Sequence, residues 1–235
     1  MTTAYNDWDE PVVAEGVYAP QEDSQLLIDV MDKTGLARGR RVADLCTGSG
    51  VIAIAAAQQG ASEVTAFDIC PRAAHFARQQ VSKAGADVGV HLGSWARAAE
   101  FGPYDLVVCN PPYVPHDPSV DEPDVPPHIG PARAWDAGYD GRLVLDPLCA
   151  SVRDLLADGG TMLLVQSEFA VPRQTLAALA STGLDVEILA YQWIPFGPVL
   201  SARAQWLEDT GRLESGRREE ELVVIRADKA SNHER

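Results

Sequence analysis

The chain carries the stretch Asp-Leu-Val-Val-Cys-Asn-Pro-Pro-Tyr at residues 105–113. Its apolar part, residues 106–109, is rich in β-branched side chains and predicts a strand buried on both faces of a sheet. The strand must stop at Pro111, because proline lacks the N–H that a sheet ladder requires. Each proline also pushes the residue before it into extended geometry. We therefore expect Asn110 at the carboxyl end of a central strand, with its side-chain amide projecting beyond the sheet.

Asn110, Pro111 and Tyr113 together predict a rigid polar pocket. The two consecutive prolines leave backbone carbonyls free of ladder bonds, the asparagine adds an amide oxygen, and the tyrosine adds a flat wall. Such a pocket suits a planar N–H₂ group, for example a side-chain amide or the exocyclic amine of a nucleobase. The alternative is a proline turn that only ends the strand, with Asn110 as a turn former.

The composition favours one globular domain spanning residues 1–235, with flexible ends at 1–15 and 228–235. The chain has enough residues for a sizeable α/β core, and its contents of 46% hydrophobic and 23% charged residues are typical of globular proteins. No apolar run approaches the roughly 18 residues of a membrane span, and the acidic N-terminus does not resemble a signal peptide. The four cysteines show no Cys-x-x-Cys pairing, so we expect reduced thiols, no metal site and a cytoplasmic location.

The net charge of the chain limits its choice of partners. At −15 it repels a phosphodiester backbone, which argues against nucleic acid as the principal partner. A membrane partner is not expected either.

A strand, a glycine-rich turn and a helix follow one another at residues 41–57. Gly48 and Gly50 allow a ligand to approach the backbone, and the helix start offers free N–H groups. Asp68 follows the next strand, 18 residues after Gly50, where an acidic side chain suits the hydroxyls of a ribose. The alternative role for Asp68 is an N-cap of the helix predicted over 71–82.

Strands and helices alternate along the whole chain, which predicts an α/β protein with a doubly wound parallel sheet. The carboxyl ends of its strands should gather Gly48, Asp68, Ser94 and Asn110 in one crevice. The long loop at 115–131 is typical of a binding loop or lid.

The predicted strands are 41–46, 63–67, 88–92, 106–109, 161–165, 186–190 and 222–226. The other predicted helices are 25–31, 143–156, 171–181 and 201–210. We expect the first of these helices to be capped by Asp23 or Ser24 and to end near Gly35. The segment that contains Trp193 and Pro195 is expected to be irregular.

These motifs resemble the class I S-adenosylmethionine-dependent methyltransferases, and among them the HemK-type protein glutamine methyltransferases. The likeness covers roughly residues 16–226 and is closest to the short branch that lacks an N-terminal helical domain. Residues 110–113 match the substrate motif of that family, 44–50 its cofactor loop, Asp68 its ribose-binding acid, and 20–23 the segment over the cofactor.

The resemblance implies a mostly parallel seven-stranded, Rossmann-like sheet whose last strand is antiparallel. It implies S-adenosyl-L-methionine as cofactor and Asn110, Pro111 and Tyr113 as catalytic residues. The cofactor-binding residues that it implies are Pro20, Glu22, Asp23, Asp44, Cys46, Thr47, Gly48, Gly50, Asp68, Ser94, Trp95 and Asn110. Two positions depart from the family pattern. Cys46 replaces the first glycine of the loop, where we expect a small side chain to be tolerated, and Ser94 replaces an acid that holds the adenine amine, which reduces the expected cofactor affinity.

The substrate that the resemblance implies is a glutamine side-chain amide in a Gly-Gly-Gln segment of a translation release factor. It also implies a small zinc-binding activator subunit at the edge strand 88–92. Three rivals remain open: an N6-adenine methyltransferase of DNA or RNA, which faces the same chemical problem; an NAD-dependent oxidoreductase, because Gly48-x-Gly50-x-x-Ala53 also fits a dinucleotide fingerprint; and a non-catalytic binding module.

Overall fold

The computed structural model describes residues 17–120 and 130–231, and it has the predicted alternation of strands and helices. Its elements are α1 (Glu22–Thr34), β1 (Arg41–Leu45), α2 (Val51–Gln58), β2 (Glu63–Asp68), α3 (Pro71–Ala84), β3 (Gly89–Leu92), α4 (Trp95–Ala98), β4 (Tyr104–Cys109), η2 (Ala132–Ala134), α5 (Leu145–Leu155), β5 (Leu156–Ser167), η3 (Glu168–Ala170), α6 (Pro172–Ser181), β6 (Asp185–Pro195), α7 (Pro198–Asp209) and β7 (Glu219–Asp228).

The strands form one seven-stranded sheet in the order β3-β2-β1-β4-β5-β7-β6. Strands β3, β2, β1, β4 and β5 pair in parallel, whereas β7 runs antiparallel between β5 and β6. The prediction of a mostly parallel, doubly wound sheet with an antiparallel last strand is therefore confirmed.

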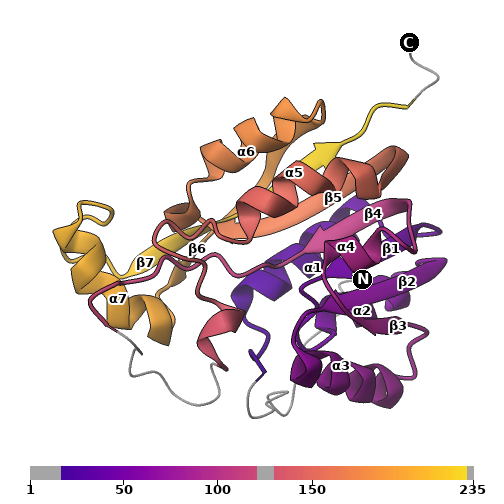
Figure 1. Ribbon diagram of the computed structural model, residues 1–235, viewed down its shortest axis with the longest axis horizontal. Helices are drawn as coiled ribbons and strands as arrows, with labels where there is room; N and C mark the ends of the chain where they lie inside the picture. The colour runs from indigo at the N-terminus through magenta and orange to yellow at the C-terminus, as the bar shows by residue number, and fades with distance from the viewer. Residues whose placement is uncertain (1–16, 121–129, 232–235) are drawn as a thin grey trace.

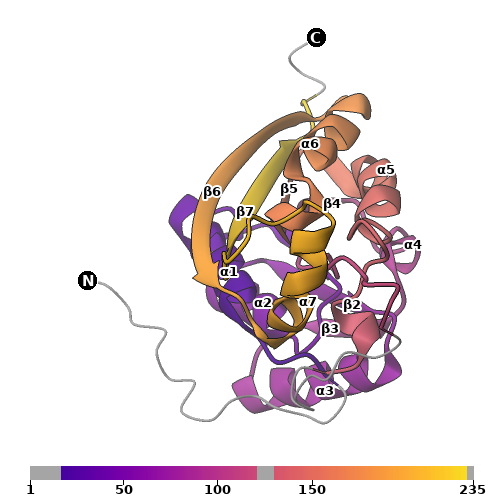
Figure 2. The same ribbon diagram turned by 90° about the vertical axis from the view of Figure 1, so that its left-hand side faces the viewer.

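Helices cover both faces of the sheet (Figures 1 and 2). Helices α1, α2 and α3 pack in succession on one face, and α4, α5 and α6 on the other. Helix α7 lies apart from both layers, at the end of the sheet where β6 finishes (Figure 1). No helix within the two described ranges is long and apolar enough to cross a membrane.

The centre of the sheet is as apolar as the stretch at 106–109 predicts. All four of these side chains are fully buried. Strand β4 pairs with β1 on one side and β5 on the other, so its backbone is satisfied until the prolines begin. The burial fixes the position at which the chain leaves the sheet, and hence the position of Asn110.

Two local predictions were wrong. Helix α1 begins earlier than expected, with Gln21 at its N-cap, so that Asp23 and Ser24 lie inside the helix and cap nothing. Strand β6 continues through the segment that we expected to be irregular, because Trp193 and Pro195 pair with β7. Strand β7 supplies a continuous partner there, and this long-range pairing overrides the weak local signal.

Candidate active site

Asn110 lies at the end of β4, and its side chain meets helix α1. Its Nδ2 donates a hydrogen bond of 3.1 Å to Oγ of Ser24. Close by, the hydroxyl of Tyr113 donates a bond of 2.9 Å to Oδ2 of Asp23. Two neighbouring residues of α1 therefore hold both ends of the Asn-Pro-Pro-Tyr motif, which gives the motif a fixed orientation rather than that of a simple surface turn.

The chain after Tyr113 is held by the segment that follows the long loop. Val114 donates a backbone bond to Trp135 (2.9 Å) and accepts one from Ala137 (3.0 Å). Gly141 packs so closely that a Cβ there would come within 2.5 Å of the Tyr113 carbonyl oxygen. The two ends of the loop are thus fastened beside the motif. Residues 121–129 of the loop predicted at 115–131 lie outside the described residues.

The glycine-rich turn joins β1 to α2, as predicted. Gly50 has φ of 86°, and a Cβ at this position would lie 3.2 Å from the Cβ of Ala77 in α3. The turn is braced by Asp44, whose Oδ2 accepts bonds from the Thr47 hydroxyl (2.6 Å) and the Ala53 amide (3.1 Å). Complete burial raises the pKa of the Asp44 carboxyl to about 7.

Asp68 stands at the tip of β2 and faces the same turn. Its Oδ2 accepts a bond from the Gly48 amide (2.9 Å), and its Oδ1 accepts one from the Cys70 amide (2.8 Å). Burial raises the pKa of this carboxyl, although these two bonds oppose the shift. The N-cap of α3 is Cys70, so the alternative reading of Asp68 as the cap does not hold.

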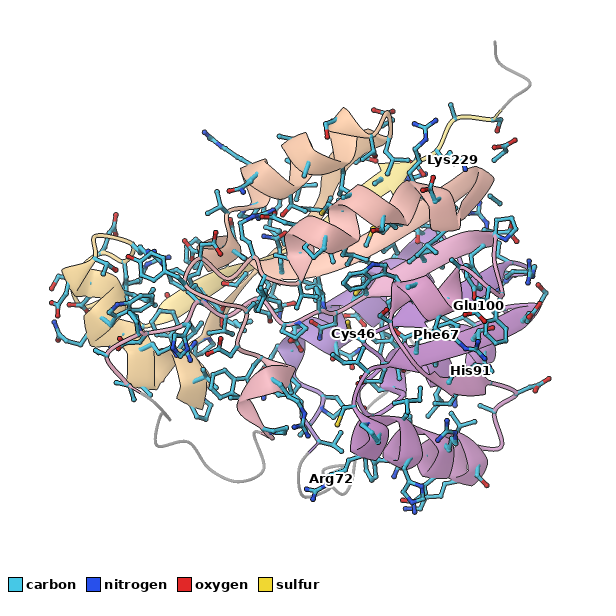
Figure 3. All side chains as sticks on the ribbon, in the orientation of Figure 1. Cys46, Phe67, Arg72, His91, Glu100 and Lys229 are labelled. Carbon is cyan, nitrogen blue, oxygen red and sulfur yellow. The ribbon has the colours of Figure 1, made fainter. Side chains whose placement is uncertain are left out.

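A cavity of about 280 Å³ opens at the carboxyl ends of β1, β2, β3 and β4. Cys46 and Phe67 lie near each other at this end of the sheet, far from Lys229 (Figure 3). We call this space the first cavity. The predicted residues that line it are Pro20, Cys46, Thr47, Gly48, Asp68, Ser94, Trp95 and Asn110. The predicted crevice is therefore present, and it connects the glycine turn to Asn110.

Ser94 and Trp95 close the first cavity beside β3. The Ser94 hydroxyl accepts a bond from the Ala96 amide at 3.3 Å and so caps the short helix α4. A serine that caps a helix can still accept a second hydrogen bond, because its oxygen has two lone pairs. The contact to the adenine amine that the resemblance assigns to Ser94 stays a prediction.

Six predicted site residues do not line the first cavity. Asp44 and Gly50 are buried and shape the glycine-rich turn, and Pro111 is buried within the motif. Glu22, Asp23 and Tyr113 face a different space, of about 290 Å³, which we call the second cavity. Tyr18 lines both cavities, so the two spaces are neighbours.

Three residues that line or hold the two cavities were not predicted as site residues. Ser24 was interpreted as a helix cap, Tyr18 received no role, and Glu220 lay just before the closing strand predicted at 222–226. Glu220 is only 6% exposed and lines the second cavity. A charged residue beside the apolar run of β7 was the available signal, but the partner of Glu220 across the sheet could not be inferred from local sequence.

Comparisons with known proteins agree on the class. A family model described as a methyltransferase small domain matches residues 13–124. A protein of Methanocaldococcus jannaschii, whose name assigns it provisionally to the protein N5-glutamine methyltransferases, is 28% identical over 80% of this chain and 91% of its own. The release factor glutamine methyltransferase of Mycolicibacterium smegmatis is 33% identical over 76% of this chain, which spans 63% of that relative.

A solved structure agrees as well. The E. cuniculi Mtq2–Trm112 complex, described as responsible for methylation of the eRF1 translation termination factor, contains a chain that is 26% identical. The match has a TM-score of 0.58 and covers 92% of this chain and 99% of that one. The sheet order, the glycine turn and the cavity beside Asn110 are typical of the class I methyltransferase fold. The sequence of this chain is similar to those of the protein glutamine methyltransferases.

Proposed function

We propose that the protein transfers a methyl group from S-adenosyl-L-methionine to the side-chain amide of a glutamine in a protein. One observation carries the proposal: Asn110 lies at the cavity that the glycine turn and Asp68 also line, and Ser24 holds its side chain there. A site for a planar N–H₂ group and a site for a nucleoside thus share one space.

The first cavity fits the cofactor in size and in chemistry. A space on the order of 300 Å³ suits a small-molecule ligand, and this one is about 280 Å³. Asp68 would accept bonds from the ribose hydroxyls, the backbone at Gly48 would lie along the amino acid part, and Trp95 would pack against the adenine. The bound cofactor supplies an electrophilic methyl group on a sulfonium.

The residues of the motif would orient the acceptor. An amide nitrogen is a poor nucleophile, because its lone pair is delocalised into the carbonyl. The Asn110 side chain and the Pro111 carbonyl would accept the two N–H bonds of the amide and aim its nitrogen at the methyl group. A new N–C bond forms as the S–C bond breaks, and the amide nitrogen then loses one proton to solvent. Rate enhancement would rest on orientation and on fixed dipoles.

A translation release factor is the substrate that we infer. The Mycolicibacterium smegmatis relative is named for release factors, and the E. cuniculi complex is described as methylating the eRF1 termination factor. The net charge of −15 also favours a basic protein surface over a phosphate backbone. The second candidate is an N6-adenine methyltransferase, which the shape of the motif also allows. The acidic charge counts against it.

Mass spectrometry decides between the two candidates. The protein is incubated with labelled cofactor and either a release factor or duplex DNA, and each product is digested and examined. We expect one methyl group on the glutamine of the Gly-Gly-Gln segment and none on adenine. Methylated adenine together with unmodified glutamine would overturn the proposal in favour of the second candidate.

A partner subunit at β3 is part of the proposal. β3 pairs only with β2 within the described sheet, so it is an edge strand, and Leu92 on it is 50% exposed. An exposed edge strand can accept a strand from another chain, and the similar E. cuniculi protein was solved as a complex with Trm112. If the purified chain alone is monomeric and fully active, no such activator is needed.

A further inference from the structure

The second cavity lies outside the site described above and has an unusual charge. It is lined by the carboxylates of Glu22, Asp23 and Glu220, whereas no lysine, arginine or histidine lines it among the described residues. Its remaining walls are mostly apolar or aromatic and include Tyr18, Tyr113, Trp135 and Phe196. Carboxylates inside mostly apolar walls suit a side chain such as lysine or arginine, which carries a cationic group on an aliphatic stem.

Glu220 is the acidic residue of this cavity that has an unpaired carboxylate oxygen. Glu220 is 6% exposed, and its Oε2 has no hydrogen-bond partner within the described residues; the ring Nε1 of Trp135, on the same cavity, has none there either. Ser167 bonds the Glu220 carboxylate, but burial and the nearby Asp23 raise its pKa to about 7. Asp23, in contrast, already accepts bonds from the Tyr113 hydroxyl and the Ser24 amide. A buried acceptor without a donor is costly, so its retention beside a cavity points to a donor that arrives with a ligand.

The position of the cavity identifies the ligand as part of the substrate. Tyr113 lines the second cavity, and Asn110, three residues earlier, lines the first. Three residues of extended chain span roughly 10 Å. A protein segment that presents an amide to Asn110 therefore places side chains within about three positions of that amide beside the second cavity.

We propose that the second cavity binds a lysine or arginine side chain of the methyl-acceptor protein. This side chain lies within about three residues of the methylated glutamine, and its cationic group pairs with the Glu220 carboxylate. This inference rests on the proposed function and adds a specificity site to it. A metal ion is not the occupant that the geometry favours, since the described residues contain no cluster of three or more metal-ligating side chains.

The test uses peptides that contain Gly-Gly-Gln, with lysine placed at each of the neighbouring positions in turn. Each lysine peptide is compared with the acetyl-lysine peptide, which has the same stem without the charge. We expect one position at which lysine raises kcat/KM by about 10-fold over acetyl-lysine, mainly through a lower KM. In Glu220→Gln this preference should fall below about 3-fold.

Glu219→Gln is the matched control, because it removes the same charge from an exposed neighbour on the same strand. It should keep the preference for lysine. Thermal unfolding and cofactor affinity of Glu220→Gln show whether that variant is folded. If lysine is preferred over acetyl-lysine at no position, or if the preference survives in Glu220→Gln, the proposed cation site is overturned. Neither result contradicts the proposed methylation of glutamine.

A binding measurement separates this proposal from the proposed function. The same peptides, with the acceptor glutamine replaced by alanine, are titrated with the protein by fluorescence anisotropy. If no peptide is methylated but lysine-dependent binding is present and is lost in Glu220→Gln, the cation site stands and the assigned acceptor fails. If neither methylation nor lysine-dependent binding occurs, both proposals fail.

Discussion

Nδ2 of Asn110 donates to Oγ of Ser24 across 3.1 Å, and this bond joins the end of β4 to the first turn of α1. The residues are 86 positions apart in the chain. The Asn110 side chain is half-buried and projects beyond the end of β4. The bond to Ser24 restricts the rotation of its amide group. Ser24 is therefore a positioning residue for the acceptor site.

Replacing Ser24 should affect turnover more than cofactor binding. We expect Ser24→Ala to lower kcat by about 10-fold, because a misaligned acceptor reacts slowly, while the affinity for the cofactor changes by less than about 2-fold. Ser24→Thr, which restores a hydroxyl, should recover part of the loss. Ser181→Ala, at an exposed serine, serves as control. Equal kinetics in the alanine variant and the wild type would remove Ser24 from this role.

Asn110→Ala should have a larger effect of the same kind. The change removes an acceptor for the N–H of the reacting amide, so we expect turnover to fall by roughly 100-fold or more. Cofactor affinity should be nearly intact, since the glycine turn and Asp68 remain. Single-turnover kinetics and calorimetry measure the two effects separately. A variant with normal turnover would show that the motif does not orient the acceptor.

Asp68 should contribute to cofactor affinity through its charge. Asp68→Asn keeps a side chain of the same size but loses the ionised acceptor, and we expect cofactor binding to weaken by about 1–3 kcal/mol. Calorimetry with the demethylated cofactor product measures the loss. Asp87→Asn, at an exposed position on the way to β3, is the matched control. Unchanged affinity in Asp68→Asn would place the ribose elsewhere.

Cys46 has a backbone conformation that favours glycine. Its φ is 58°, which is left-handed, and this is the position where the resembled family has glycine. A side chain in this region costs roughly 1–2 kcal/mol relative to glycine. We expect Cys46→Gly to be more stable than Cys46→Ala by about 1 kcal/mol, once the greater flexibility of glycine in the unfolded chain is included. Urea unfolding of both variants tests this, and the reverse order would contradict it.

Local sequence was sufficient to predict the frame of the first cavity. The apolar run at 106–109, the two prolines after it and the glycine turn each act over a few residues, and each specifies its own backbone geometry. Once the strands alternate with helices, their carboxyl ends must meet at one edge. The structure brings Gly48, Asp68, Ser94 and Asn110 to that edge for this reason.

The contacts between distant segments could not be predicted in this way. Ser24 was one of two candidate caps of the predicted helix, and its bond to Asn110 exists only after α1 packs against the sheet. Glu220 pairs with Ile194 across β7 and β6, so its burial depends on a strand that was assigned as irregular. The error in β6 therefore hid both the second cavity and its acidic residue.

Glu220 should make the stability of the protein depend on pH. Its pKa is raised from 4.5 to about 7, chiefly by burial and then by Asp23, Glu168 and Glu22. Between these two values the folded protein retains a proton that the unfolded chain has lost. The free energy of unfolding contributed by this group is therefore highest below pH 4.5 and decreases as the pH rises through about 7.

Glu220→Gln removes this dependence, because an amide carries no charge at any pH. Compared with the wild type, the variant should gain free energy of unfolding by about 2 kcal/mol between about pH 5 and about pH 8. Urea unfolding at several pH values measures the difference. Asp44, whose pKa is also about 7, is unchanged in both proteins, so its contribution cancels. Glu219→Gln, at an exposed neighbour on the same strand, is the matched control. A difference for Glu220→Gln that stays constant with pH would show that burial does not raise the pKa of the Glu220 carboxyl.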